Sequence, residues 1–596
     1  MLEARKYKWI DVLRIPYEIS PLLIVAYVFL ELIQAIISTF VVVYATSFFV
    51  DTAFAVFADK LLVSTIYAPL GVLLGVVAIS NIIDNFFGVL QSRLKIVMEL
   101  KLEPAILDTQ ASLKYKYIED SNTRELVERL SEGIVVNLLS GVRACAVIAR
   151  SIVSIAAILT LILAQVWWAA ILIAILSVPL FWMSLKAGGE NYDAWMEAWP
   201  YEHRFSYYSD DILTSREATQ ERTLFGYADY IVNLHSNHFE IARKIQEKVG
   251  IRTKIAIEAT GIFMSVIALL ISFTLIKPVI AGTLSPGMFM GVVSAVFSMA
   301  TTIGGTLQES AKDLSYAKRC MDDLTVFMAL DLQDGATDLP DKIPPVFESL
   351  SFKNVWFKYP NAEHYTLRNV SFDIQGNKHY AFVGANGSGK TTIIKLLTGL
   401  YDMYDGEILI NGKELRTYAT STLKAIFSVV YQDFARYEVS LKDNIALGNA
   451  SKDVSVEEIH KVTDKVALTD TIANLKDGLY TPLGKIDKDG LELSGGQWQK
   501  VAIARSLISP APIKILDEPT AALDPIAESR IYQEFEELMK RKTTIFISHR
   551  LGSTKLANEI LVIDGGEIIE KGTHNELIKM SGTYANMFES QRRWYE

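Results

Sequence analysis

Six long apolar runs in the first half of the chain constrain its fold more than any other feature. Each is close to the ~20 residues that a helix needs to cross a bilayer, whereas apolar runs in soluble α/β cores are about 5 to 12 residues long. They extend over about residues 22–49, 66–90, 142–164, 166–185, 255–276 and 288–303. Only Gln165 separates the third run from the fourth, which predicts a very tight turn. We therefore expect six transmembrane helices.

The distribution of lysine and arginine orients these helices. The connection over 51–64 contains Lys60 alone, and the connection over 277–287 contains Lys277 alone. The connections after the second and fourth runs are long, polar and rich in both signs of charge. Because basic residues collect on the cytoplasmic side, we expect a multi-pass protein of the cell membrane with both termini in the cytoplasm.

The two long connections, 91–140 and 186–254, have the charge pattern of helices and few Pro or Gly residues. The apolar helices are therefore expected to continue into the cytoplasm as stalks and fold back. We interpret residues 115–122 and 207–217 as the turning points that touch a cytoplasmic domain. The alternative is that they are solvated, charged helical faces.

Asp84 lies near the cytoplasmic end of the second run, with Asn81 and Asn85 close by. An ionisable group at membrane depth is a candidate for a substrate or ion site. Alternatively, Asp84 pairs with a neighbouring helix or reaches the interface, and the sequence leaves both possibilities open.

The character of the chain changes after the sixth run. At 596 residues the chain is too long for a single core. Residues 331–345 are rich in Asp, Pro and Gly, and from residue 347 short strand patterns alternate with helical ones. We expect a transmembrane domain over 1–330, a linker over 331–346 and an α/β nucleotide-binding domain over 347–596. A net charge of −10 gives no indication of a nucleic-acid partner.

Residues 384–392, GANGSGKTT, match the phosphate-binding pattern G-x-x-x-x-G-K-[ST] between an apolar strand and a helix. Backbone N–H groups of such a loop surround phosphate oxygens at a helix N-terminus. Lys390 can reach the β- and γ-phosphates, and the Thr391 hydroxyl can hold Mg²⁺. We expect the nucleotide to be bound by Gly384, Asn386, Gly387, Ser388, Gly389, Lys390, Thr391 and Thr392.

A second element of this site is the run IKILDE at residues 513–518. A short strand would carry Asp517 to its end, where the carboxylate can bind Mg²⁺ directly or through water. Glu518 beside it is placed to accept a proton from the attacking water. The pair predicts a hydrolase of the nucleotide.

The pentapeptide LSGGQ at residues 493–497 matches the signature of ATP-binding cassette (ABC) proteins at all five positions. Other cassette elements follow in the family's order. Tyr359 resembles the aromatic residue that stacks on adenine, and Gln432 the glutamine that links the metal site to the membrane domain. Asp524 resembles part of the loop that crosses between subunits, and His549 the histidine that contacts the γ-phosphate.

This resemblance implies a complete set of site residues for ATP and Mg²⁺. Nucleotide contacts would also come from Tyr359, Asp524 and the signature residues Ser494, Gly495, Gly496 and Gln497. Metal ligands would be Thr391, Gln432 and Asp517, and catalysis would involve Glu518, His549 and Gln432. In this family ATP lies between the P-loop of one cassette and the signature of another, so that two chains are needed, either identical or different.

Six spans followed by one cassette resemble a half-transporter of the ABC exporter type. The resemblance implies ATP-driven export of a peptide or amphiphilic small molecule by alternating access. The alternatives are a flippase for a lipid or lipid-linked glycan, and a non-transporting, ATP-dependent sensor or regulator. Asp487, Asp489 and Trp498 resemble cassettes of peptide and lantibiotic exporters from Gram-positive bacteria, which favours a bacterial cell membrane. The substrate itself cannot be read from the fold.

Overall fold

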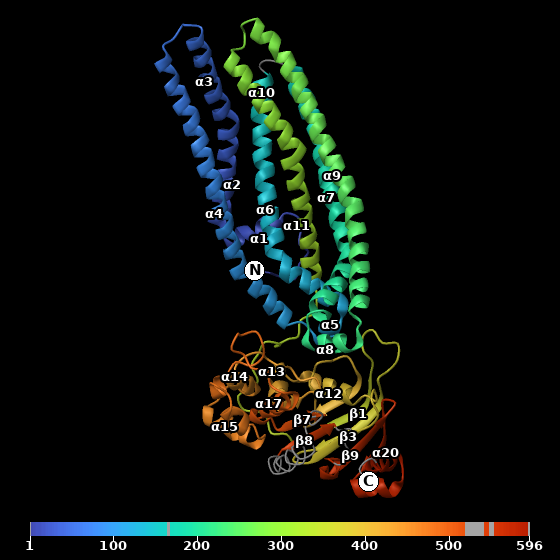
Figure 1. Ribbon diagram of the computed structural model, residues 1–596. Coiled ribbons are helices and arrows are strands. Elements are labelled where there is room, and N and C mark those ends of the chain that lie inside the picture. The colour runs from blue at the N-terminus through green and yellow to red at the C-terminus, as the bar shows by residue number, and fades with distance from the viewer. Residues whose placement is uncertain (1, 164–166, 519–541, 548–552, 594–596) are drawn as a thin grey trace. The chain divides into compact units, whose positions relative to one another are not determined.

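The computed structural model describes residues 2–163, 167–518, 542–547 and 553–593 (Figure 1). The chain divides into two compact units. The first is helical and comprises Met1–Thr109 and Arg124–Leu330, and the second comprises Gln110–Thr123 and Asp331–Glu596. The predicted tight turn at Gln165 lies outside the described residues.

Long helices make up the first unit. Its helices are α1 (Asp11–Ile19), α2 (Pro21–Ile36), α3 (Val42–Phe57), α4 (Tyr67–Ala111), α6 (Ser121–Leu163), α7 (Trp167–Ser206), α8 (Arg216–Phe225), α9 (Ala228–Ile280), α10 (Pro286–Thr301) and α11 (Leu307–Met328). Among the described residues, four helical stretches are long and apolar enough to cross a membrane, and α10 is a shorter apolar helix. The fourth apolar run lies on α7. The predicted α-helical membrane domain is confirmed.

Four of these helices are much longer than a bilayer is thick. α4, α6, α7 and α9 contain 45, 43, 40 and 53 residues, which at 1.5 Å per residue corresponds to roughly 60 to 80 Å. The hydrocarbon core measures only ~30 Å. About half of each helix must therefore extend beyond the membrane, as the predicted stalks require. In Figure 1, α7 and α9 run side by side.

Two π-helical turns link consecutive helices of the first unit. Ile37–Val41 (η1) connects α2 to α3, and Thr302–Thr306 (η4) connects α10 to α11. A π turn contains one residue more than an α turn, and such turns occur frequently at functional sites. A third, Tyr207–Ile212 (η3), follows α7 and falls within the second predicted turning segment.

Close packing of α3 against α10 depends on glycine. A Cβ atom at Gly287 would lie 2.3 Å from the backbone oxygen of Ser47. Asp51 at this seam accepts hydrogen bonds from the Gly287 backbone N–H and from the Ser285 hydroxyl, both at 2.7 Å. Asp51 thus accepts a hydrogen bond from a backbone N–H at the N-terminus of α10, where the first N–H groups of a helix have no partner within the helix.

The described residues of the second unit form two sheets. The smaller one is antiparallel, with strand order β2-β1-β4-β5, and is built from β1 (Ser349–Phe357), β2 (Leu367–Gln375), β4 (Asp405–Ile410) and β5 (Lys413–Glu414). The larger one has the order β10-β9-β3-β8-β7-β6, from β3 (His379–Val383), β6 (Phe427–Val430), β7 (Ile513–Asp517), β8 (Thr543–Ile547), β9 (Glu559–Asp564) and β10 (Glu567–Gly572).

Every pairing in the larger sheet is parallel except that of β9 with β10. Every residue of β7 and β8 is buried, as expected for parallel strands covered on both faces. The described helices of the unit include α12 (Lys390–Leu397), α13 (Thr420–Ile426), α14 (Leu441–Ala446), α15 (Val456–Lys465), α16 (Thr469–Ala473), α17 (Gly495–Ile508), α19 (His574–Met580) and α20 (Thr583–Arg592). The predicted α/β domain is therefore confirmed.

The first predicted turning segment belongs to this second unit. It contains the short helix α5 (Tyr115–Glu119), which lies between α4 and α6 in the sequence. The backbone N–H of Lys114 donates to the Asp331 carbonyl at 3.3 Å, and that of Gln333 to the Ser112 carbonyl at 2.7 Å. Lys116 forms an ion pair of 2.9 Å with the Asp331 carboxylate. The segment therefore touches the α/β unit, as the sequence predicts.

Candidate functional site

The phosphate-binding pattern forms the loop between β3 and α12. Gly387 and Gly389 have φ angles of +78° and +106°, in the left-handed region that favours glycine. A Cβ atom at Gly389 would also lie 2.6 Å from the side chain of Leu367. The loop can therefore turn its backbone N–H groups toward one side, where α12 begins at Lys390.

Lys390 is buried, and its Nζ donates to the carbonyl oxygens of Gly384 and Ala385 at 2.9 and 2.8 Å. Burial lowers the pKa of Lys390, although the nearby carboxylates of Glu518 and Asp517 act in the opposite direction. The neutral carbonyls orient the ammonium group but do not balance its charge. An anionic phosphate group would balance the charge of Lys390.

Asp517 ends strand β7 and is buried. The Thr391 hydroxyl donates to its Oδ2 at 3.2 Å. Burial raises the pKa of Asp517 to about 6. Its Oδ1 and the Ser388 hydroxyl have no hydrogen-bond partner among the described residues. An unpaired buried carboxylate oxygen is costly, and a hard divalent cation is the natural partner for carboxylate and hydroxyl oxygens.

Glu518, the next residue, has a φ of +50°. Non-glycine residues seldom adopt this left-handed conformation, and such residues cluster at active sites. Its backbone N–H donates to the Ile547 carbonyl at 2.9 Å, which anchors the conformation between β7 and β8.

One cavity of about 620 Å³ brings together residues that are far apart in the sequence. It is lined by Tyr359, Thr366, Asn386, Gly387, Ser388, Gly389, Lys390, Thr391, Thr392, Gln432 and Glu518. The Tyr359 hydroxyl lies 3.0 Å from that of Thr392. This volume is within the range of small-ligand sites, and its residue set is suited to a magnesium-bound nucleotide.

The structure does not bring every predicted site residue to this cavity. Ser494, Gly495, Gly496 and Gln497 do not line it. They begin α17, where the Ser494 hydroxyl accepts from the Gln497 N–H at 3.3 Å and the Gln497 side chain accepts from the Ser494 N–H at 2.9 Å. Asp524 and His549 lie outside the described residues.

A chain of contacts that sequence reasoning missed leads from this cavity to α5. The Lys395 ammonium lies 5.4 Å from the centre of the Tyr359 ring and 2.6 Å from Glu119 Oε1. Tyr401 packs edge-on against Tyr359, with ring centroids 5.4 Å apart, and donates a hydrogen bond to Glu119. Burial alone would raise the pKa of Glu119, but these hydrogen bonds lower it. Lys395 is a basic residue one turn into the P-loop helix, a weak signal that the sequence did offer.

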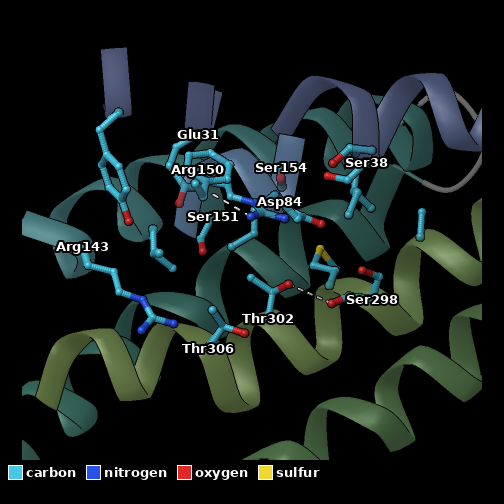
Figure 2. Close-up of a pocket in the computed structure, with 18 of the residues that line it drawn as sticks. Glu31, Ser38, Asp84, Arg143, Arg150, Ser151, Ser154, Ser298, Thr302 and Thr306 are labelled. Carbon is cyan, nitrogen blue, oxygen red and sulfur yellow. Dashed lines mark hydrogen bonds and ion pairs between the residues drawn. The ribbon is translucent and has the colours of Figure 1, made fainter. Parts of the chain in front are cut away.

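A second cavity, of about 570 Å³, lies within the helical unit (Figure 2). Its charged lining residues are Glu31, Asp84, Arg143 and Arg150, and its hydroxyl-bearing ones include Ser38, Thr39, Ser151, Ser154, Ser298, Thr302 and Thr306. Arg150 contacts Glu31 at 3.3 Å. Asp84 both lines the cavity and accepts a hydrogen bond of 3.1 Å from Gln34, so that the two interpretations of this residue are not exclusive.

Sequence reasoning selected Asp84 but passed over Glu31, Arg143 and Arg150. All three lie inside or at the edge of the apolar runs. The signal that could have found them was therefore present, because any ionisable residue in such a run is a candidate functional group. What the sequence could not show is that four such residues from three helices meet at one cavity.

Comparison with known proteins gives a consistent picture. The family model described as "ABC transporter" matches residues 367–521. The chain is 31% identical over 526 residues to the subtilin transport ATP-binding protein SpaT of Bacillus subtilis, covering 87% of this chain and 84% of that protein. It is 37% identical over 342 residues to the ATP-dependent lipid A-core flippase of Photobacterium profundum, covering 56% of this chain and 57% of that protein.

The fold has a counterpart among solved structures. A bacterial Atm1-family ABC exporter with ATP bound superposes with a TM-score of 0.73, covering 96% of this chain and 98% of that one, at 22% sequence identity. At this identity the likeness concerns the fold. It covers both units, and not the cassette alone.

Proposed function

The chain belongs to the ABC transporters, as a half-exporter whose cassette binds ATP, and we propose that two such chains export a substrate across a bacterial cell membrane. The membrane domain would extend over 1–330 and the nucleotide-binding domain over 347–596, joined by the linker 331–346. Both termini and the cassette would lie in the cytoplasm. The observation that carries this function is the cavity shared by Tyr359, the P-loop, Gln432 and Glu518 in a chain with long apolar helices.

The residues of that cavity have distinct roles in the proposed hydrolysis of ATP. Lys390 would bind the β- and γ-phosphates, while Tyr359 would stack on adenine. Thr391, Gln432 and Asp517 would hold Mg²⁺, whose charge polarises a phosphoryl oxygen. Glu518 would accept the proton of the attacking water. Asp524 and His549 would complete the site, an assignment that rests on family resemblance alone.

The proposal requires a second cassette. Ser494, Gly495, Gly496 and Gln497 do not line the chain's own nucleotide cavity, yet they begin a 14-residue helix whose N-terminus suits an anion. They would contact the γ-phosphate of the nucleotide held by a second chain. A homodimer is the simplest arrangement, and both Glu518 and His549 are present, as an active homodimer needs. A heterodimer is the alternative.

Two substrate classes follow from the relatives. SpaT is named for the transport of subtilin, which favours a peptide or amphiphilic small molecule. The lipid A-core flippases favour a lipid, but their match covers 57% or less of their length in the examples from Photobacterium profundum and Pasteurella multocida. We propose export of a peptide or amphiphile, with lipid flipping as the alternative.

Steady-state ATP hydrolysis by the purified full-length protein in lipid nanodiscs tests this function. Peptides, amphiphilic compounds and lipids would each be titrated, and we expect one class to stimulate hydrolysis. Hydrolysis that responds to none of them would favour the sensor or regulator alternative. Absence of hydrolysis by a dimer that still binds ATP would contradict the assignment of an active homodimer.

A further inference from the structure

The cavity of the helical unit concentrates charge where charge is costly. Ionisable side chains at membrane depth are rare and usually serve a function. This cavity is lined by Glu31 on α2, Asp84 on α4 and both Arg143 and Arg150 on α6 (Figure 2). Two carboxylates and two guanidinium groups therefore give its described lining a formal charge of zero.

Glu31 and Arg150 balance one another. Their closest atoms are 3.3 Å apart, and the Glu31 side chain is only 6% exposed. Removing Arg150 would leave the buried Glu31 carboxylate without its ion-pair partner. Arg143 and Asp84 also interact electrostatically with Glu31, but only Arg150 forms an ion pair with it among the described residues, so that Arg143 and Asp84 are the charges most available to a ligand.

Arg143 and Asp84 are differently placed. Arg143 is exposed and has neither a hydrogen bond nor an ion pair with any residue that the structure describes. Glu31 and Asp313, on α2 and α11, interact with it electrostatically without forming an ion pair within 4.0 Å. In Figure 2 the Arg143 side chain extends from α6 toward the segment that carries Thr302 and Thr306. Asp84 is also exposed, and among the residues that the structure describes only Gln34 donates a hydrogen bond to it.

Both π-helical turns within the membrane helices reach this cavity. Ser38 and Thr39 belong to η1, and Thr302 and Thr306 to η4. The two turns lie on different helices and approach the same space, and their hydroxyl groups can bind polar atoms of a ligand. Because π turns occur frequently at functional sites, the position of both turns beside this cavity supports a binding site independently of the charges.

The balance of charge distinguishes a free peptide from an anionic lipid headgroup. An anionic lipid headgroup, which has phosphate groups and no ammonium group, is best matched by an excess of cations, but in the described lining Arg143, the cation without an ion pair, is accompanied by the anion Asp84. A free peptide carries one carboxylate and one ammonium group, which are complementary to Arg143 and Asp84. Apolar side chains of α6 that line the same cavity, such as Val147, Ile155 and Ile158, can contact the peptide's side chains. The volume of about 570 Å³ suits a short segment.

We propose that this cavity binds the charged ends of a peptide, the carboxylate at Arg143 and the ammonium group at Asp84. This inference rests on the proposed export function. The two contacts need not be made by one molecule at the same time. Hydroxyl groups of η1 and η4 would bind polar atoms of the peptide backbone. Arg143 and Asp84 are then the residues that determine specificity.

The test uses peptides that differ only at their ends. A mixture of random hexapeptides is prepared with both ends free, with the N-terminus acetylated, with the C-terminus amidated, and with both ends blocked. Each form is titrated against ATP hydrolysis by the full-length protein in nanodiscs, and the half-stimulating concentration is measured. In the unmodified protein, blocking either end should raise this concentration about tenfold or more, the effect expected when a charged hydrogen bond is lost.

Variants then assign each end to a residue. In Arg143→Gln, peptides with a free and with an amidated C-terminus should have the same half-stimulating concentration, while the preference for a free N-terminus remains. In Asp84→Asn, peptides with a free and with an acetylated N-terminus should have the same half-stimulating concentration. Arg143→Lys, which retains the charge, should restore part of the C-terminal preference. Asn85→Ala is the matched control, because Asn85 adjoins Asp84 but is absent from the lining of the cavity.

The proposal would be overturned if all four peptide forms stimulated ATP hydrolysis equally or if the end preferences persisted in both variants. It would also be overturned if no peptide changed the rate of hydrolysis. Stimulation by a phosphate lipid that depends on Arg143 would assign the cavity to a lipid instead. In all these cases the unmodified protein would still hydrolyse ATP, whereas loss of hydrolysis in the unmodified dimer would contradict the export function itself.

Discussion

Lys395 donates a hydrogen bond of 2.6 Å to the carboxylate of Glu119. Lys395 lies on α12, the helix that begins at the P-loop, and Glu119 ends α5, the short helix between α4 and α6. The same ammonium group approaches the ring of Tyr359, the proposed adenine contact. A single side chain thus connects the nucleotide cavity to the segment that joins two membrane helices.

Breaking this connection should separate ATP hydrolysis from transport. In Glu119→Gln the ion pair is lost, but the pair is partly exposed, so that the cost in stability should stay below about 1 kcal/mol. We expect hydrolysis to continue while its stimulation by substrate falls about 2- to 30-fold, the range for loss of a coupling contact. Equal changes in hydrolysis and stimulation would contradict the role of Glu119, and Glu567→Gln on the exposed strand β10 is the control.

Glu518→Gln should leave ATP binding intact and lower turnover by about 10²- to 10⁴-fold, because the amide cannot accept the proton of the attacking water. Nucleotide affinity and steady-state hydrolysis are measured on the same preparation. Normal turnover would rule out Glu518 as the base, and a loss of affinity would indicate that it supports the site structurally.

Lys390→Ala should weaken ATP binding by about 10- to 100-fold, the range for loss of a charge-assisted hydrogen bond. The affinity can be measured by equilibrium binding of a fluorescent ATP analogue. Lys579→Ala, at an exposed position of α19, should bind as the unmodified protein does. Unchanged affinity in Lys390→Ala would contradict its contact with the phosphates.

Asp51→Ala should destabilise the seam between α3 and α10 by about 1 to 2 kcal/mol, because the N-terminus of α10 loses its capping carboxylate. The thermal unfolding temperature in detergent should fall, with Lys60→Ala as an exposed control. An unchanged unfolding temperature would show that water replaces the carboxylate at no cost.

Local patterns in the sequence predicted much of the nucleotide site. The P-loop, Asp517 and Glu518 occupy short segments whose spacing requires a strand, a turn or a helix, and the structure places these residues around one cavity or directly beside it. Tyr359 and Gln432 were placed by family resemblance, and both line the same cavity.

Contacts between distant segments were not predictable in this way. Glu119 and Lys395 are 276 residues apart, and neither belongs to a motif. The pairing of Arg150 with Glu31 depends on how α6 packs beside α2, which apolar periodicity does not specify. The π turns have no sequence signature, although they bring hydroxyl groups to the membrane cavity.

The most direct test of ATP-driven export is the uptake of a labelled, free-ended hexapeptide mixture into inside-out vesicles that contain the purified protein. We expect peptide to accumulate in the vesicles only when ATP and Mg²⁺ are outside, and Glu518→Gln vesicles to accumulate none. Hydrolysis of ATP without accumulation of peptide or flipping of lipid would contradict ATP-driven export.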